Sequence, residues 1–291
     1  MSIVDAHLHF WRLARGDYAW LTPENTALYR DFSPADIAPA LKAHGVQSAV
    51  AVQAAATEAE TRFLFEIARE HPVVAGVVGW TDFEAPDAAE RIAALHEQGR
   101  GLLKGFRPMV QDIADADWLA RPALDPAFDA LVALDLSFDA LVRPAHLPAL
   151  LARLRRSPEL RVVIDHGGKP DIGGSGFGAW AGQIAQLARQ AGTVCKLSGL
   201  LTEAQEDATL ADLQPYAAHL FDSFGPCRMM WGSDWPVVTL RADYAVWLAS
   251  AKALVGRYAR GYEDEVFSQT ARRCYRLWQR ALPKPTQGTN A

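Results

Sequence analysis

The feature that most limits the possible folds is a repeated alternation of short apolar runs with longer amphipathic stretches. Eight runs rich in valine, leucine, isoleucine and alanine recur along the 291 residues. Nearly continuous apolar runs of this length are typical of strands that are buried on both faces of a parallel sheet. We therefore predict strands at residues 2–8, 46–53, 73–80, 101–107, 136–142, 161–166, 193–198 and 227–233.

The stretches between these runs have the pattern of surface helices. Thr57 and Glu60 are spaced as a capping box, and the apolar residues that follow them share one helical face. Eight strands with intervening helices are the elements of a single (β/α)8 TIM barrel, an α/β fold that typically has about 250 residues. Further helices are predicted near 34–44, 86–98, 125–134, 145–156, 178–190, 208–223, 240–256 and 263–278.

A chain of this length has room for two ordinary domains or for one large barrel. A doubly wound fold would place a glycine-rich turn after the first strand, but that strand leads into His-Phe-Trp-Arg at residues 9–12. No linker rich in glycine, serine or proline divides the sequence. We therefore expect the barrel to span residues 1–282 and the polar residues 283–291 to form a flexible C-terminal tail.

Composition excludes several classes of partner. The formal net charge of −5 argues against a nucleic-acid-binding protein, which usually carries a basic surface. No apolar stretch reaches the roughly 18 residues of a membrane helix, and no signal peptide precedes the first strand. The three cysteines, Cys195, Cys227 and Cys274, lack the spacing of a disulfide framework or a CxxC motif. Free thiols of this kind indicate a cytoplasmic location.

Polar residues follow the predicted strands at the end where a TIM barrel carries its active site. His7 and His9 lie two residues apart, so both imidazoles should face the same side and suit a divalent metal or a substrate oxygen. Each such residue has a structural explanation when taken alone, such as a core histidine or a helix-capping aspartate. Together they indicate a site, because buried charges are costly without partners or a ligand. The other members are Gln53, Trp80, Arg107, Arg143, His166, Lys196, Asp234 and Trp235.

The motifs at these strand ends resemble those of the amidohydrolase superfamily. Within it, the sequence is similar to the lactonase branch that includes L-fuconolactonase, L-rhamnonolactonase and 2-pyrone-4,6-dicarboxylate lactonase. The ordered set of motifs is far more specific than its HxH element alone, and it extends over almost the whole chain. The stretches that carry the resemblance are 4–11 (VDAHLHFW), 50–54 (VAVQA), 78–80 (VGW), 104–107 (KGFR), 165–170 (DHGGKP), 195–199 (CKLSG) and 232–236 (GSDWP).

The resemblance implies a carboxylic-ester hydrolase that opens a sugar lactone, such as L-fucono- or L-rhamnono-lactone, to the sugar acid. Asp234 would activate the attacking water, while His166 and Lys196 would stabilise the oxyanion. One divalent ion, zinc or manganese, would be held by His7, His9 and Asp234, with His166 as a further candidate; catalysis without a metal remains open. The residues expected to bind the small-molecule substrate are Gln53, Trp80, Arg107, Arg143 and Trp235.

Other functions remain to be tested by structure. Arg143 stands where a binuclear amidohydrolase would carry a histidine on strand five, so a binuclear centre is not expected. A 2-pyrone-4,6-dicarboxylate-type lactonase would need cations for two carboxylates, for which Lys104, Arg107, Arg143 and Lys196 are available. A mononuclear metal-dependent decarboxylase and a non-catalytic sugar-binding barrel are further alternatives. Which sugar lactone is preferred, and the oligomeric state, are not predicted.

Overall fold

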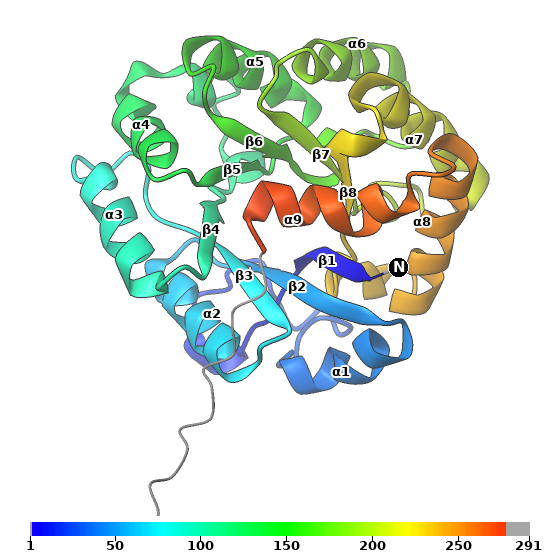
Figure 1. The fold of residues 1–291 in the computed structure, drawn as a ribbon, viewed down its shortest axis with the longest axis horizontal. Helices are drawn as coiled ribbons and strands as arrows, with labels where there is room; N and C mark the ends of the chain where they lie inside the picture. The colour runs from blue at the N-terminus through cyan, green and yellow to red at the C-terminus, as the bar shows by residue number, and fades with distance from the viewer. Residues whose placement is uncertain (1, 278–291) are drawn as a thin grey trace, which may run out of the picture.

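A computed structural model describes residues 2–277 and shows eight parallel strands that pair in the order of the sequence. The strands form a ring, and the helices that connect them surround it, as Figure 1 shows. The fold is thus the predicted (β/α)8 TIM barrel. The strands are β1 Ile3–Leu8, β2 Val46–Val52, β3 Val74–Gly79, β4 Leu103–Phe106, β5 Ser137–Ala140, β6 Arg161–Ile164, β7 Thr193–Leu197 and β8 Met229–Trp231.

The helices follow the predicted pattern of periodicity and capping. Thr57 caps the second helix by accepting a hydrogen bond from the Glu60 amide at 3.1 Å. None of the helices in this part of the chain is long and apolar enough to cross a membrane. The predicted boundary at residue 282 and the tail at 283–291 lie outside the described residues. The helices are α1 Pro34–Ala43, α2 Glu58–Glu70, α3 Ala88–Gly99, α4 Asp125–Ala133, α5 Leu147–Arg156, α6 Phe177–Ala188, α7 Leu210–Phe224, α8 Tyr244–Tyr258 and α9 Thr270–Tyr275.

Several strands are shorter than the apolar runs predicted. The eighth was expected over 227–233, but only Met229–Trp231 pair as a strand. The fourth was expected to reach residue 107 and ends at Phe106. The residues beyond these ends leave the sheet, and they include many of the polar residues predicted to form the site.

The ring is closed where β1 meets the chain that follows β8. The Asp234 amide donates to the His7 carbonyl at 2.8 Å, and the His9 amide donates to the Trp235 carbonyl at 2.7 Å. A Cβ atom at Gly232 would lie 2.6 Å from the Cβ of His7, so only glycine permits this close approach. Because the bonds that close the barrel involve the neighbours of its polar residues, ring closure also brings His7, His9 and Asp234 together.

The amino end of the barrel is sealed by the C-terminal part of the chain. In Figure 1, the orange-red helix α9 lies across the ring of strands. A short π-helix, Glu265–Gln269, leads into it, and Thr270 donates to the carbonyl of Cys227, just before β8. The predicted last helix therefore closes the fold. Apolar side chains inside the barrel pack against it: Val4, Ala6, Val50, Val52, Val78, Val163 and Met230 contact Ala271, Cys274, Tyr275 and Leu277 in one cluster.

Candidate active site

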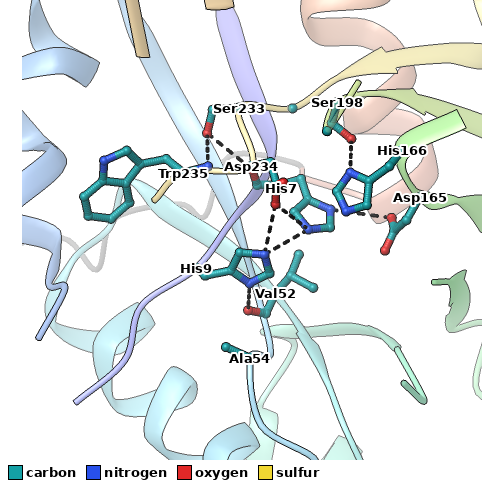
Figure 2. A network of polar contacts seen from close by, with 12 residues as sticks. His7, His9, Val52, Ala54, Asp165, His166, Ser198, Ser233, Asp234 and Trp235 are labelled. Carbon is teal, nitrogen blue, oxygen red and sulfur yellow. Dashed lines mark hydrogen bonds and ion pairs between the residues drawn. The ribbon is translucent and has the colours of Figure 1, made fainter. Parts of the chain in front are cut away.

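Two histidines and an aspartate meet at the carboxyl end of the barrel (Figure 2). His9 Nδ1 lies 2.8 Å from the Val52 carbonyl, which can only accept, so this nitrogen donates and Nε2 faces the site. His9 Nε2 lies 3.2 Å from His7 Nε2 and 3.2 Å from Asp234 Oδ1. His7 Nε2 and Asp234 Oδ1 are 3.6 Å apart. Three potential ligand atoms thus lie within 3.6 Å of one another.

These separations fit a single divalent ion. Ligand atoms in a tetrahedral site with bonds of about 2.0–2.1 Å lie roughly 3.3 Å apart. His166 offers a further ligand: together with His7 and Asp234 it forms a buried group whose ligand atoms lie within 4.8 Å. Its Nδ1 pairs with Ser198 Oγ at 2.8 Å, which leaves Nε2 for the site when Nδ1 carries the proton. The structure therefore supports a divalent metal site, and the donor set alone does not choose the metal.

Asp234 is held as an ionised carboxylate in an uncommon backbone conformation. Its φ of 59° lies in the left-handed region, which is rare for a residue other than glycine and is often found at functional sites. Burial alone would raise the pKa of this carboxyl, but the adjacent imidazoles of His166, His9 and His7 outweigh burial and hold the pKa below its usual range. At neutral pH the carboxylate is therefore available to accept a proton.

Lys196, on β7, contacts His7 and is fully buried. Its Nζ is 2.7 Å from Asp139 Oδ2, 2.9 Å from Asp165 Oδ1 and 3.1 Å from His7 Nδ1. Burial would lower the pKa of the amine, but Asp139 and Asp165 together raise it, so Lys196 stays charged. The ammonium thus forms hydrogen bonds with Asp139 and His7 and an ion pair with Asp165. The predicted direct contact with an oxyanion would require Lys196 to leave these partners, and its placement favours an effect through His7.

His7 Nδ1 lies between a donor and an acceptor. Lys196 Nζ is 3.1 Å away, and Asp165 Oδ1 is 3.5 Å away on the same nitrogen. If Nδ1 accepts from Lys196, the proton of a neutral His7 is on Nε2; if a cation binds at Nε2, the proton must be on Nδ1 and Asp165 becomes its acceptor. Burial and Lys196 both lower the pKa of His7, so the ring is neutral in either arrangement.

Arg107 and Gln53 hold each other at the edge of this group. Gln53 Nε2 donates to the Arg107 carbonyl at 2.6 Å, and the Arg107 guanidinium donates to the Gln53 carbonyl. Arg107 Nη1 lies 3.3 Å from His7 Nε2 and 3.5 Å from Asp165 Oδ2. Its Nε is buried and has no hydrogen-bond partner among residues 2–277. The side chain of Gln53 is thus used to orient Arg107, which itself retains an available donor.

A cavity of about 540 Å³ lies over the ends of β2, β3 and β4. Ala54 and Pro108 line it and directly follow Gln53 and Arg107, so the cavity adjoins the polar group without containing it. The structure places Trp80 in its wall, and among the described residues that line it there is no lysine, arginine or histidine. The lining comprises Asp17, Ala19, Trp20, Ala54, Ala55, Ala56, Trp80, Thr81, Asp82, Phe83, Glu84, Pro108, Met109, Asp112, Ile113 and Trp118.

The remaining predicted residues lie in different surroundings. The Trp235 indole is buried and packs against Phe10 and Phe32, with ring centroids 6.1 and 5.3 Å away. Figure 2 shows it pointing away from His7 and Asp234. Arg143 is exposed and directs Nε to the Gln111 carbonyl at 3.4 Å. Lys104 donates to the carbonyl of Arg276 near the opposite end of the barrel, away from the predicted site.

Several members of the site were not assigned roles from the sequence. Asp139 interrupts the fifth apolar run, and a charged residue in a strand buried on both faces was the available signal. Asp165 lies in the motif at 165–170 beside His166, and Ser198 lies in the motif at 195–199 close to Lys196. Asp5 accepts hydrogen bonds from the Ser233 amide at 2.8 Å and from the Tyr244 hydroxyl at 3.1 Å, which fixes the chain before Asp234.

Comparison with known proteins points to the same family that the sequence motifs resemble. A family model described as amidohydrolase matches residues 4–277. The chain is 45% identical over 258 residues, 88% of each sequence, to an L-fucono-1,5-lactonase of Burkholderia ambifaria. It is 37% identical over 303 aligned positions, 97% of each sequence, to an L-fucono-1,5-lactonase of Burkholderia multivorans. A crystal structure of an amidohydrolase from Burkholderia multivorans with bound zinc has a TM-score of 0.88 and 35% identity, covering 95% of this chain and 100% of that one.

Proposed function

The chain belongs to the amidohydrolase family, and we propose that it is a lactonase that opens a neutral sugar lactone, of the L-fucono-1,5-lactone type, to the sugar acid. The observation that carries the proposal is the buried, ionised Asp234, which lies 3.2 Å from His9 in a polar group that adjoins a cavity lined with tryptophan. The two relatives named L-fucono-1,5-lactonase, at 45% and 37% identity, support the same substrate class.

Asp234 acts as the base in the proposed mechanism. It takes a proton from a water molecule as the water oxygen attacks the lactone carbonyl carbon. The tetrahedral oxyanion that forms is stabilised by positive charge and donors already in place, for which Arg107 and His166 are the nearest candidates. Asp234 then returns the proton to the ring oxygen as the C–O bond breaks. One water is consumed, and the product carries a free hydroxyl and a carboxyl group.

His7, His9 and Asp234 would hold a divalent ion, with His166 as a fourth ligand, and zinc is proposed because the similar Burkholderia multivorans structure contains it. A bound ion of this kind polarises a carbonyl and lowers the pKa of water. The protein's own contribution is to fix the rings: Val52, Ser198 and Asp165 each face the Nδ1 of one histidine, at 2.8, 2.8 and 3.5 Å.

The cavity is proposed to hold the hydroxyl-bearing part of the lactone. Trp20 and Trp80 offer aromatic faces for its C–H groups, and carboxylates such as Asp82 and Asp112 offer acceptors for hydroxyls. Arg143, which is exposed and contacts the Gln111 carbonyl next to the lining residue Asp112, is proposed to meet the carboxylate of the product. Of the lining carboxylates, Glu84 forms an ion pair at 2.9 Å with Arg121, a residue that does not line the cavity. A substrate with two carboxylates would meet like charge here, which disfavours the dicarboxylate alternative.

The test is a panel of neutral aldonolactones, with 2-pyrone-4,6-dicarboxylate and an aromatic carboxylic acid included, followed with a pH indicator. Ring opening releases acid, whereas decarboxylation consumes protons. We expect acid release from at least one neutral lactone, with kcat/KM of about 10⁴ M⁻¹s⁻¹ or more. Acid release from the dicarboxylate alone, or from no lactone above the spontaneous rate, would contradict the proposal.

A further inference from the structure

Tyr275 reaches from helix α9 into the interior of the barrel. Its side chain is fully buried in the apolar cluster that seals the amino end, yet its hydroxyl donates to Asp139 Oδ2 at 2.5 Å. Ser137 donates to the other oxygen of Asp139 at 2.8 Å. Packing alone would be satisfied by phenylalanine at this position. What the hydroxyl adds to packing is the hydrogen bond that holds the Asp139 carboxylate.

Asp139 in turn sets the position of Lys196. Its Oδ2 accepts from Lys196 Nζ at 2.7 Å, and the same ammonium lies 5.4 Å from the centre of the Tyr275 ring. Lys196 then contacts His7 Nδ1 at 3.1 Å. A continuous chain of three short contacts thus links the C-terminal helix to the histidine at the centre of the candidate active site, through residues that are all fully buried.

We propose that Tyr275 is a positioning residue, which acts through Asp139 and Lys196 to hold the His7 ring in place. Without the hydroxyl, Asp139 Oδ2 keeps a single donor, and Lys196 can move from His7 toward Asp165, only 2.9 Å away. His7 Nδ1 then loses its fixed neighbour. A change in the orientation of His7 alters its distances to His9 and Asp234, and therefore the geometry of the candidate active site. The activity readout of this proposal rests on the proposed lactonase function; its spectroscopic readout does not.

The first experiment compares Tyr275→Phe with Tyr18→Phe in the full-length protein. Tyr18 is the matched control, because its hydroxyl also donates to a buried carboxylate, Glu60 at 2.6 Å, in a network that includes neither Lys196 nor His7. We expect Tyr275→Phe to lower kcat about 10-fold with KM changed less than about 2-fold, as for partners of active-site histidines. The ¹⁵N signals of the His7 ring, assigned with His7→Gln, should shift in Tyr275→Phe alone.

The second experiment is a double-mutant cycle with Lys196→Met, or with Lys196→Arg if the methionine variant does not fold. The effect of Tyr275→Phe should disappear when Lys196 is replaced, because the two residues act in series. The proposal is overturned if Tyr275→Phe only lowers the melting temperature, with kcat and the His7 signals unchanged, or if its effect persists undiminished in the Lys196 variant. A wild type without lactonase activity but with the expected His7 shift would refute the function and leave this inference standing.

Discussion

Charged side chains from β1, β5–β8 and the residue after β4 gather around His7, whereas the cavity over β2–β4 is walled mainly by aromatic and aliphatic residues. In the first region nearly every charge has a fixed partner: Lys196 contacts two carboxylates and a histidine, and Arg107 contacts Asp165. In the second, Trp20, Trp80 and Trp118 supply shape and apolar surface. The arrangement separates the two requirements of an enzyme, because preorganised charge stabilises a transition state and a shaped cavity binds the substrate. Substitutions in the first region should therefore change kcat, and those in the second should change KM.

The largest effect should come from Asp234→Asn. The amide cannot accept the proton of water at neutral pH, so kcat on the preferred lactone should fall at least about 10³-fold, with the circular dichroism spectrum unchanged. Asp222→Asn, on the exposed face of α7, is the matched control and should keep wild-type kcat. Near-normal turnover by Asp234→Asn would remove the base from the mechanism.

A buried carboxyl on the cavity side sharpens the comparison. Burial raises the pKa of Glu60 to about 7, although the Tyr18 hydroxyl, the Ala54 amide and Arg15 oppose this. The folded state therefore holds a proton that the unfolded state releases near pH 4.5. The stability contributed by this proton is complete below about pH 4.5 and is lost as the pH rises through 7, a change of about 3 kcal/mol in the free energy of unfolding.

Denaturant titrations at pH 4.5 and 7.5 measure this contribution. Wild-type protein should lose about 3 kcal/mol more unfolding free energy across this interval than Glu60→Gln does, because the amide does not ionise. Glu66→Gln, on the exposed face of the same helix, should retain the wild-type dependence. Equal slopes for wild type and Glu60→Gln would show that Glu60 ionises normally in the folded protein.

Removal of the metal tests the first region in another way. Thorough chelation, verified by elemental analysis, should lower kcat about 10²-fold, and one equivalent of zinc or manganese should restore it. His9→Gln should weaken zinc affinity in a competition titration with a chromogenic chelator, because His9 Nε2 lies within 3.2 Å of both His7 Nε2 and Asp234 Oδ1. Full activity of demonstrably metal-free protein would assign stabilisation of the oxyanion to Arg107 and His166 alone.

The aromatic wall of the cavity should affect binding more than turnover. Trp80→Leu removes a ring that lines the cavity, and we expect KM to rise about 10-fold with kcat changed less than about 2-fold. Tyr262→Leu, at an exposed aromatic residue outside the cavity lining, is the control. A fall in kcat with constant KM would mean that the two regions do not divide their roles as proposed.

The smallest effect should come from the charge at the cavity rim. Asp112→Asn removes an exposed carboxylate, so the sugar acid product should inhibit about 2-fold more strongly at low salt, and less so at high salt. Glu159→Gln, exposed and outside the cavity lining, serves as the control. An unchanged inhibition constant at low salt would show that the rim charge does not act on the anionic product.

The sequence by itself determined the eight strands, the barrel and most of the polar residues at its carboxyl end. Those features are encoded locally, in apolar runs of strand length, in capping residues and in motifs such as the one at 232–236 that contains Asp234. They also predicted that His7 and His9 face the same way, because side chains two apart share one side of a strand.

Only the tertiary structure decided how these residues pair. It packs the Trp235 indole against Phe32 and pairs Gln53 with Arg107 through hydrogen bonds. It also connects Tyr275 to Lys196 through hydrogen bonds to Asp139. The physical reason is that these contacts join segments distant in the sequence, and many lie where the chain has left the sheet and strand alternation no longer fixes side-chain direction. The partners of a buried charge depend on which groups the closed ring brings within hydrogen-bonding distance.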